Sequence, residues 1–217
     1  MAHMMALQNL TIRVETMLPT VESLSNDDLA TILLVYDEAI RPYFMGWLGL
    51  AFSGARSIEA RLVLRDNLFE EVEEDHPAML REFTASIRQM VDPDDLARRL
   101  YIIRSESRAL TMLAAELPLN AIVLIAALEV SSLAFVTWLA EAAERLAIHD
   151  LAYVEEHGEA DIVHADDLQR VLPTELRTWG LDDATVQSLL DHVLPLVLEF
   201  LKHIFHSHRA LVALTTK

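Results

Sequence analysis

Apolar residues recur at steps of three and four along almost the whole chain, which is the pattern of amphipathic helices. Only 5 glycines and 7 prolines occur in 217 residues, so long helical segments run without a breaker. No segment of the sequence alternates apolar and polar residues as a half-buried strand does. The sequence therefore predicts an all-α fold.

Capping residues and prolines set the expected helix boundaries. Ser25 and Asp92 are typical N-terminal caps, and Pro118 suits the first turn of a helix. No linker, repeat or low-complexity segment divides the chain, so residues 5–217 are expected to form a single-domain bundle of about seven helices. We expect a short helix over 7–17 and then helices over 27–52 (bent at Pro42), 57–75, 77–90, 92–117, 118–148, 149–171 and 182–212.

Composition excludes several classes of protein. The absence of cysteine rules out disulfides, thiolate zinc sites and cysteine nucleophiles, and it is compatible with the cytoplasm, where we expect the protein. The formal net charge of −17 argues against nucleic-acid partners and anionic membrane surfaces. The most apolar stretch, 117–140, contains Asn120 and Glu129 and is predicted to be a core helix rather than a membrane span. Residues 1–4 are typical of an expression-vector remnant, so His3 is set aside.

An HxxxDxxH motif is the strongest candidate for chemistry. His157, Asp161 and His164 have the spacing that places three side chains on one face of a helix. Imidazole and carboxylate together are the donors that non-haem iron and manganese favour, whereas Mg²⁺ and Ca²⁺ prefer oxygen alone. The same spacing also occurs on ordinary amphipathic surface helices, so the motif needs support from elsewhere in the chain.

Two further segments supply that support. Glu129 is the one charged residue between Pro118 and Ala140, and a buried carboxylate is costly unless a metal or a cationic partner compensates it. His76 follows a run of acids, with Glu73 three residues earlier on the same helical face. A buried salt bridge would explain Glu129 without a metal, and most of the acids before His76 are expected to be solvated.

In these residues the chain resembles the haem-oxygenase-like diiron oxidase and oxygenase superfamily, which includes the Chlamydia protein associating with death domains. The resemblance extends over most of the chain. It implies a seven-helix haem-oxygenase-like bundle that binds two metal ions through a glutamate–histidine pair, a mid-chain glutamate and a terminal HxxxDxxH. It rests on the order of six segments, namely Leu24–Leu29, Tyr36, Arg41–Phe44, Asn67–Glu71 with His76, Leu128–Glu129, and the motif of His157, Asp161 and His164.

Carried over by position, the resemblance implies a set of metal ligands in which one position is left to either of two glutamates. The Asn-Leu-x-Glu-Glu pattern points to Glu70 as the glutamate of the first pair, whereas straight-helix geometry favours Glu73, so both are kept. In some relatives a tyrosine near the metals is consumed as substrate, and Tyr36 is the candidate here. The lack of a histidine between His3 and His76 argues against haem. The other implied ligands are His76, Glu129, His157, Asp161 and His164.

The function that this resemblance implies is O₂-dependent oxidation of a small molecule in a biosynthetic pathway. The cofactor would be two non-haem iron ions, or one manganese and one iron, with O₂ as co-substrate. The alternative is a non-catalytic helical bundle on the same fold that binds a ligand or a partner. No nucleic-acid or membrane partner is expected, and a homodimer is compatible with the sequence. Packing or surface roles are expected for Tyr153, Arg104, Arg108, His203 and His206.

Overall fold

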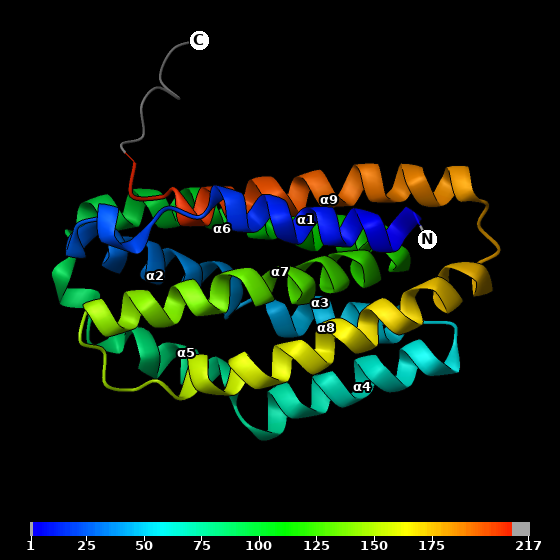
Figure 1. The fold of residues 1–217 in the computed structure, drawn as a ribbon, viewed down its shortest axis with the longest axis horizontal. Coiled ribbons are helices and arrows are strands. Elements are labelled where there is room, and N and C mark those ends of the chain that lie inside the picture. Colours follow the sequence, from blue (N-terminus) through cyan, green and yellow to red (C-terminus); the bar gives the residue numbers. More distant parts are fainter. Residues whose placement is uncertain (1, 210–217) are drawn as a thin grey trace, which may run out of the picture.

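The computed structural model describes residues 2–209, and this part of the chain folds as an all-α bundle without strands (Figure 1). The predicted single-domain, all-α architecture is confirmed. Two short 3-10 helices, η1 (Val21–Ser23) and η2 (Arg88–Met90), precede α2 and α6. Within the described residues the α-helices are α1 (Ala2–Met17), α2 (Asn26–Ile40), α3 (Phe44–Gly54), α4 (Ile58–Glu73), α5 (His76–Ala85), α6 (Pro93–Glu116), α7 (Pro118–Arg145), α8 (Ala152–Thr178) and α9 (Asp183–Phe205).

The helix predicted over 27–52 is in fact two helices, and the proline lies at their junction. Residues 41–43 form a turn that separates α2 from α3. A proline ring has no N–H to donate and collides with the carbonyl of the preceding turn. Pro42 therefore ends the hydrogen-bonded ladder instead of bending it.

Other boundaries differ by smaller amounts. Helix α8 continues through Pro173 to Thr178, past its predicted end at Val171. The helix predicted over 77–90 divides into α5 and η2. Helix α9 ends at Phe205, and the last predicted helical residues, 210–212, lie outside the described residues.

Helix α7 is the central element of the bundle. It contacts α1, α3, α6, α8 and α9, and every side chain from Leu119 to Ser132 is buried. By length and composition, both α7 and α9 could cross a membrane. Core helices of soluble proteins meet the same criteria, so two such helices are weak evidence of membrane spans. In the most apolar window of α7, 83% of the residues are buried inside the bundle, as expected for a core helix, against 39% for α9.

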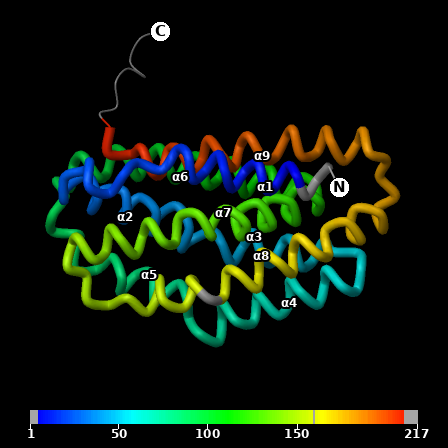
Figure 2. The backbone as a smooth tube through the Cα atoms, in the orientation of Figure 1, coloured from blue at the N-terminus to red at the C-terminus, as the bar shows by residue number. Residues whose placement is uncertain are grey.

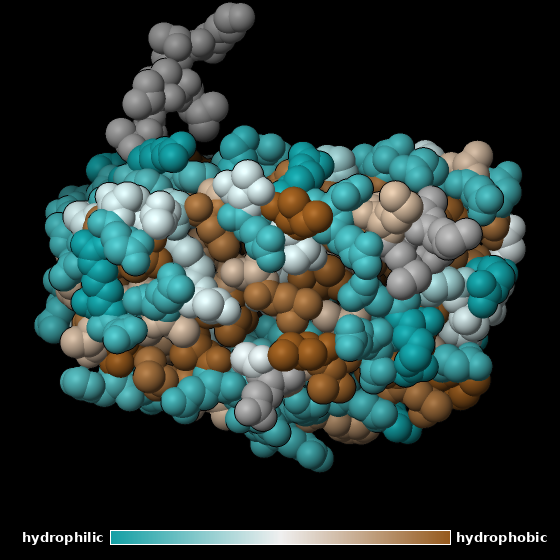
Figure 3. Space-filling view, viewed as in Figure 1, coloured by the Kyte–Doolittle hydropathy of each residue, from teal (hydrophilic) through white to brown (hydrophobic). Residues whose placement is uncertain are grey.

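Helix α8 lies between α7 and α4 and also contacts α5 (Figures 1 and 2). The chain reverses sharply between α4 and α5, where Asp75 adopts a left-handed conformation with φ 54°. Aspartate tolerates this region because its short polar side chain can hydrogen-bond locally. His76 consequently begins a new helix that returns beside α8. On the face shown in Figure 3, hydrophilic side chains surround a hydrophobic area across the middle of the bundle.

Candidate metal centre

Buried acids and histidines gather in two groups along the N-terminal half of α8. In each group the potential ligand atoms lie within 4.8 Å of one another, which is close enough for one metal ion to bind them together. Each group could therefore hold a metal ion. The first group is Glu71 of α4, His76 of α5 and His157 of α8, and the second is Glu129 of α7 with Asp161 and His164 of α8.

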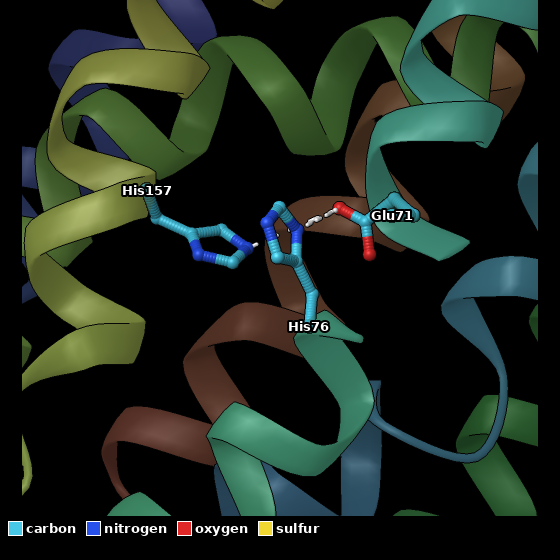
Figure 4. Close-up of side chains that lie close together, drawn as sticks. All are labelled: Glu71, His76 and His157. Atoms are coloured by element: carbon cyan, nitrogen blue, oxygen red, sulfur yellow. Dashed lines mark hydrogen bonds and ion pairs between the residues drawn. The ribbon is translucent and has the colours of Figure 1, made fainter. Parts of the chain in front are cut away.

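In the first group, His76 lies between two carboxylates. Its Nδ1 is 2.9 Å from Glu71 Oε1, and its Nε2 is 2.9 Å from Glu74 Oε2. His157 faces this pair from α8, with Nε2 4.0 Å from Glu71 Oε1 (Figure 4). Because the carbonyl oxygen of Tyr153 can only accept, Nδ1 of His157 donates to it at 2.9 Å. This hydrogen bond leaves the lone pair of Nε2 free to bind a metal.

In the second group, His164 bridges carboxylates from two helices. Its Nδ1 is 3.7 Å from Glu129 Oε2, and its Nε2 is 3.2 Å from Glu70 Oε2. Asn67 donates from Nδ2 to Glu129 Oε1 at 2.7 Å. Among the described residues, the buried Oδ2 of Asp161 has no hydrogen-bond partner. A carboxylate oxygen left in this state is costly, and a cation held by the group would remove the cost.

The histidines differ in protonation. Burial lowers the pKa of His76, but the hydrogen bonds and charges of Glu71 and Glu74 outweigh it and raise the pKa to about 9. Burial is likewise outweighed at His164, where Glu129 and Glu70 raise the pKa to about 9. Burial and then the charge of His76 lower the pKa of His157 to about 3, so that ring is neutral.

Two of the buried acids have pKa values above those of ordinary carboxyl groups. Burial raises the pKa of Glu71, and burial followed by the charge of Glu129 raises that of Asp161 well above its usual range. Three carboxylates in an interior need compensating positive charge. With pKa values of about 9, His76 and His164 would be protonated at neutral pH and supply it, and divalent cations would supply it in their place. The residues therefore fit a pair of metal ions.

A partly open cavity adjoins both groups. Five of the six grouped side chains line it, all except His164. Its other walls are largely apolar and come from α2, α3, α5 and α7, including Ile40, Phe44, Leu80 and Phe135. A small molecule in this cavity would therefore lie directly against the candidate ligands.

The structure brings together five residues that the sequence singled out, and it places a different glutamate beside them. Glu70 and Glu73 were the alternatives for the first pair, but Glu71 occupies that place. Glu70 is half-buried and bonds to His164 in the second group instead. Glu73 is exposed on the outer side of α4.

The correction has a physical cause. The choice of Glu73 assumed one straight helix through His76, whereas the reversal at Asp75 ends α4 before that residue. The sequence did carry a usable signal, because the buried positions of α4 repeat at steps of four, three and four. These positions are Ala60, Leu64, Asn67 and Glu71.

Tyr36 also lines the cavity, where its hydroxyl is 2.8 Å from that of Tyr153. Burial raises the pKa values of both phenols well above their usual range, so both are neutral. Arg104 pairs with Glu38 from an exposed position, and Arg108 is also exposed. Of the histidines of α9, His203 pairs with Glu106, His192 is exposed, and neither belongs to the two groups.

Comparison with known proteins adds no relative. A scan against protein-family models finds no match, and a search of curated proteins finds none either.

Proposed function

We propose that this protein is a non-haem dimetal oxidase or oxygenase that uses O₂ to oxidise a small molecule in a biosynthetic pathway. One observation carries the proposal: two buried groups of carboxylates and imidazoles, each able to hold a metal ion, border one apolar cavity. The resemblance to the haem-oxygenase-like diiron superfamily supports the same function.

The donor set favours iron or manganese. Each group mixes imidazole nitrogen with carboxylate oxygen, and the chain has no cysteine that would supply a softer thiolate. Two iron ions, or one manganese and one iron, would supply the electrons that reduce O₂.

The protein's own residues would prepare the site for this chemistry. The carbonyl of Tyr153 orients His157, and the amide of Asn67 orients Glu129. The largely apolar walls of the cavity would limit the access of water to the reacting groups. Tyr36 also lines the cavity, so it remains the side chain that we propose takes part in the reaction.

Metal content and oxygen consumption test the proposal. After anaerobic loading with ferrous ion and desalting, the wild-type protein is expected to retain two metal ions per chain and to consume O₂ on exposure to air. A His157→Ala variant should retain fewer ions and consume O₂ more slowly. Failure of the wild-type protein to bind either iron or manganese would contradict the proposal.

A non-catalytic binding protein is the second candidate. The hydrogen bonds of His76 and His164 to carboxylates already satisfy these side chains without a metal, which favours this alternative. Ligand binding in the cavity without retention of metal would identify it.

A further inference from the structure

Helix α4 carries large apolar side chains on the side that faces away from the bundle. Its main contacts are with α3, α5 and α8, and it lies along one edge of the molecule (Figure 1). Among the described residues no other helix has more than two exposed large apolar side chains, whereas α4 has four. These are Ile58, Leu62, Phe69 and Val72, which are 63%, 42%, 56% and 58% exposed.

The spacing of these side chains places them in one row, which includes Arg65 and is called the outer stripe below. Its five positions, 58, 62, 65, 69 and 72, follow one another at steps of four and three residues. The buried positions of α4 between Ala60 and Glu71 follow similar steps on the opposite side. Packing in the bundle explains the inner row but leaves the outer stripe in water. An apolar row with this spacing is typical of a helix that pairs with a second helix.

The charges beside the outer stripe match a second copy of the same helix. Glu59, Asp66 and Glu73 recur at steps of seven along one flank and are all exposed. The basic residues, Arg61 and Arg65, lie toward the other flank. If two α4 helices pair in parallel about a twofold axis, the acidic flank of each copy lies beside the basic flank of the other. Antiparallel helices would place the two acidic flanks together, where like charges repel.

The central charged pair of the outer stripe has bonding capacity left. Nε and Nη2 of Arg65 both donate to Oδ1 of Asp66, at 2.8 and 2.5 Å. In the part of the chain that the structure describes, Nη1 of Arg65 and Oδ2 of Asp66 make no hydrogen bond. These two side chains are 44% and 64% exposed. In a parallel helix pair, Arg65 of each copy would reach Asp66 of the other.

We infer that two copies of this chain associate through the outer stripe, with their α4 helices parallel about a twofold axis. Removal of the apolar side chains from water stabilises the dimer, and the Arg65–Asp66 contacts set the orientation. The formal charge of −17 on each copy opposes association, although salt screens this repulsion. One pair of helices buries less surface than a standard interface, so the dimer Kd is expected to be on the order of 10 µM. The inference is independent of the proposed function, because association requires no metal.

The first experiment measures association of the wild-type protein and of two matched variants. In sedimentation velocity from about 1 to about 200 µM, the wild-type chain is expected to shift from monomer to dimer. Phe69→Glu should raise the Kd at least about tenfold, because it places a charge within the stripe. Met112→Glu adds the same charge at a 74% exposed position on α6, and it should leave the Kd within about threefold. Equal effects of the two substitutions would overturn the inference. A wild-type chain that stays monomeric would also overturn it and leave the stripe to a different protein.

An exchange of charges tests the contact between Arg65 and Asp66. Arg65→Asp leaves two adjacent acids at the centre of the stripe, and Asp66→Arg leaves two adjacent bases. Each variant alone should associate at least about tenfold more weakly than the wild-type chain, because like charges then meet. An equimolar mixture of the two variants should associate as well as the wild type, since each acid again faces a base. Such a rescue also shows that both variants fold, whereas a mixture that stays monomeric would overturn the inference.

Single cysteines test the orientation, because the natural sequence contains none. In a parallel pair, residue 58 lies beside its own counterpart, and so does residue 72. Ile58→Cys and Val72→Cys should therefore each form a disulfide-linked dimer on mild oxidation, whereas Met112→Cys should not. Cross-linking only in a mixture of Ile58→Cys and Val72→Cys would show antiparallel helices and overturn the proposed orientation. Equal cross-linking of all three single variants would overturn the inference.

Discussion

The imidazole rings of His76 and His157 lie 4.4 Å apart between their centroids, yet their pKa values are shifted in opposite directions. The carboxylates of Glu71 and Glu74 raise the pKa of His76 to about 9 against the effect of burial. Burial and the neighbouring charge of His76 lower that of His157 to about 3. One ring is thus ready to bind a metal at neutral pH, and the other must first lose a proton.

Metal affinity should therefore rise with pH. His76 and His164, each with a pKa of about 9, have to release protons when a metal ion binds. Between pH 6.5 and 8.5 the affinity for manganous ion is expected to increase by up to about tenfold per pH unit for each proton released. Anaerobic calorimetry in buffers of different ionisation enthalpy would measure both the affinity and the proton release. An affinity that is independent of pH would contradict this prediction.

The metal-free protein should show the opposite trend in stability. A histidine whose pKa is raised from 6.5 in the unfolded chain to about 9 in the folded one stabilises the fold below pH 6.5. That contribution is lost as the pH rises through 9, and the raised pKa of Glu71 acts in the same direction. With chelator present, the melting temperature is expected to fall between pH 6.5 and 9.5. His164→Gln should flatten the profile, and an unchanged profile would show that this residue is not the cause.

Glutamine substitutions in α4 should distinguish the contributions of Glu70, Glu71 and Glu73 to metal binding. Saturation with manganous ion at 100 times its Kd is expected to raise the melting temperature of the wild-type protein by about 5–10 °C. Glu71→Gln should lose most of this rise because it removes a grouped carboxylate, while the exposed Glu73→Gln should keep it in full. Glu70→Gln should keep a reduced rise, since it only removes the partner of His164. A full rise in Glu71→Gln would contradict the assignment.

The sequence predicted the helical architecture and five of the six grouped residues for different reasons. Periodicity is a local property, so it identified α7 as a core helix and placed the three side chains of the α8 motif on one face. Glu129 stood out because a lone acid in an apolar helix requires compensation.

The remaining features depend on backbone conformation that the sequence pattern does not specify. The left-handed residue Asp75 directs α5 back toward α8, and this reversal makes Glu71 rather than Glu73 the neighbour of His76. Asp37 pairs with two arginines that lie 4 and 51 residues from it along the chain, and the distant one has no local signature.

Packing between α3 and α7 should be sensitive to the addition of a side chain at Gly54. A Cβ atom at this position would lie 2.3 Å from Cβ of Pro118, at the first turn of α7. Gly54→Ala is therefore expected to lower the free energy of unfolding by about 1–3 kcal/mol. Gly49 on the same helix has no atom within 4 Å of such a Cβ, and Gly49→Ala should stabilise the protein by up to about 1 kcal/mol. Urea unfolding measures both, and equal effects would contradict the predicted contact.

The hydrogen bond between Tyr36 and Tyr153 should be visible as a coupling energy. Both hydroxyls are buried and 2.8 Å apart, so Tyr36→Phe leaves the hydroxyl of Tyr153 without its partner. The single substitution is expected to lower the free energy of unfolding by about 1–3 kcal/mol. Tyr101→Phe is the matched control, because Tyr101 is 77% exposed and its substitution should have little effect.

The double variant Tyr36→Phe/Tyr153→Phe should lose less stability than the sum of the two single variants, since no unpaired hydroxyl remains. Urea unfolding of all four proteins gives the coupling energy directly. Additive effects would show that the two hydroxyls do not interact in solution. The rise in melting temperature on metal binding should persist in Tyr36→Phe, because neither group of potential ligands contains that side chain.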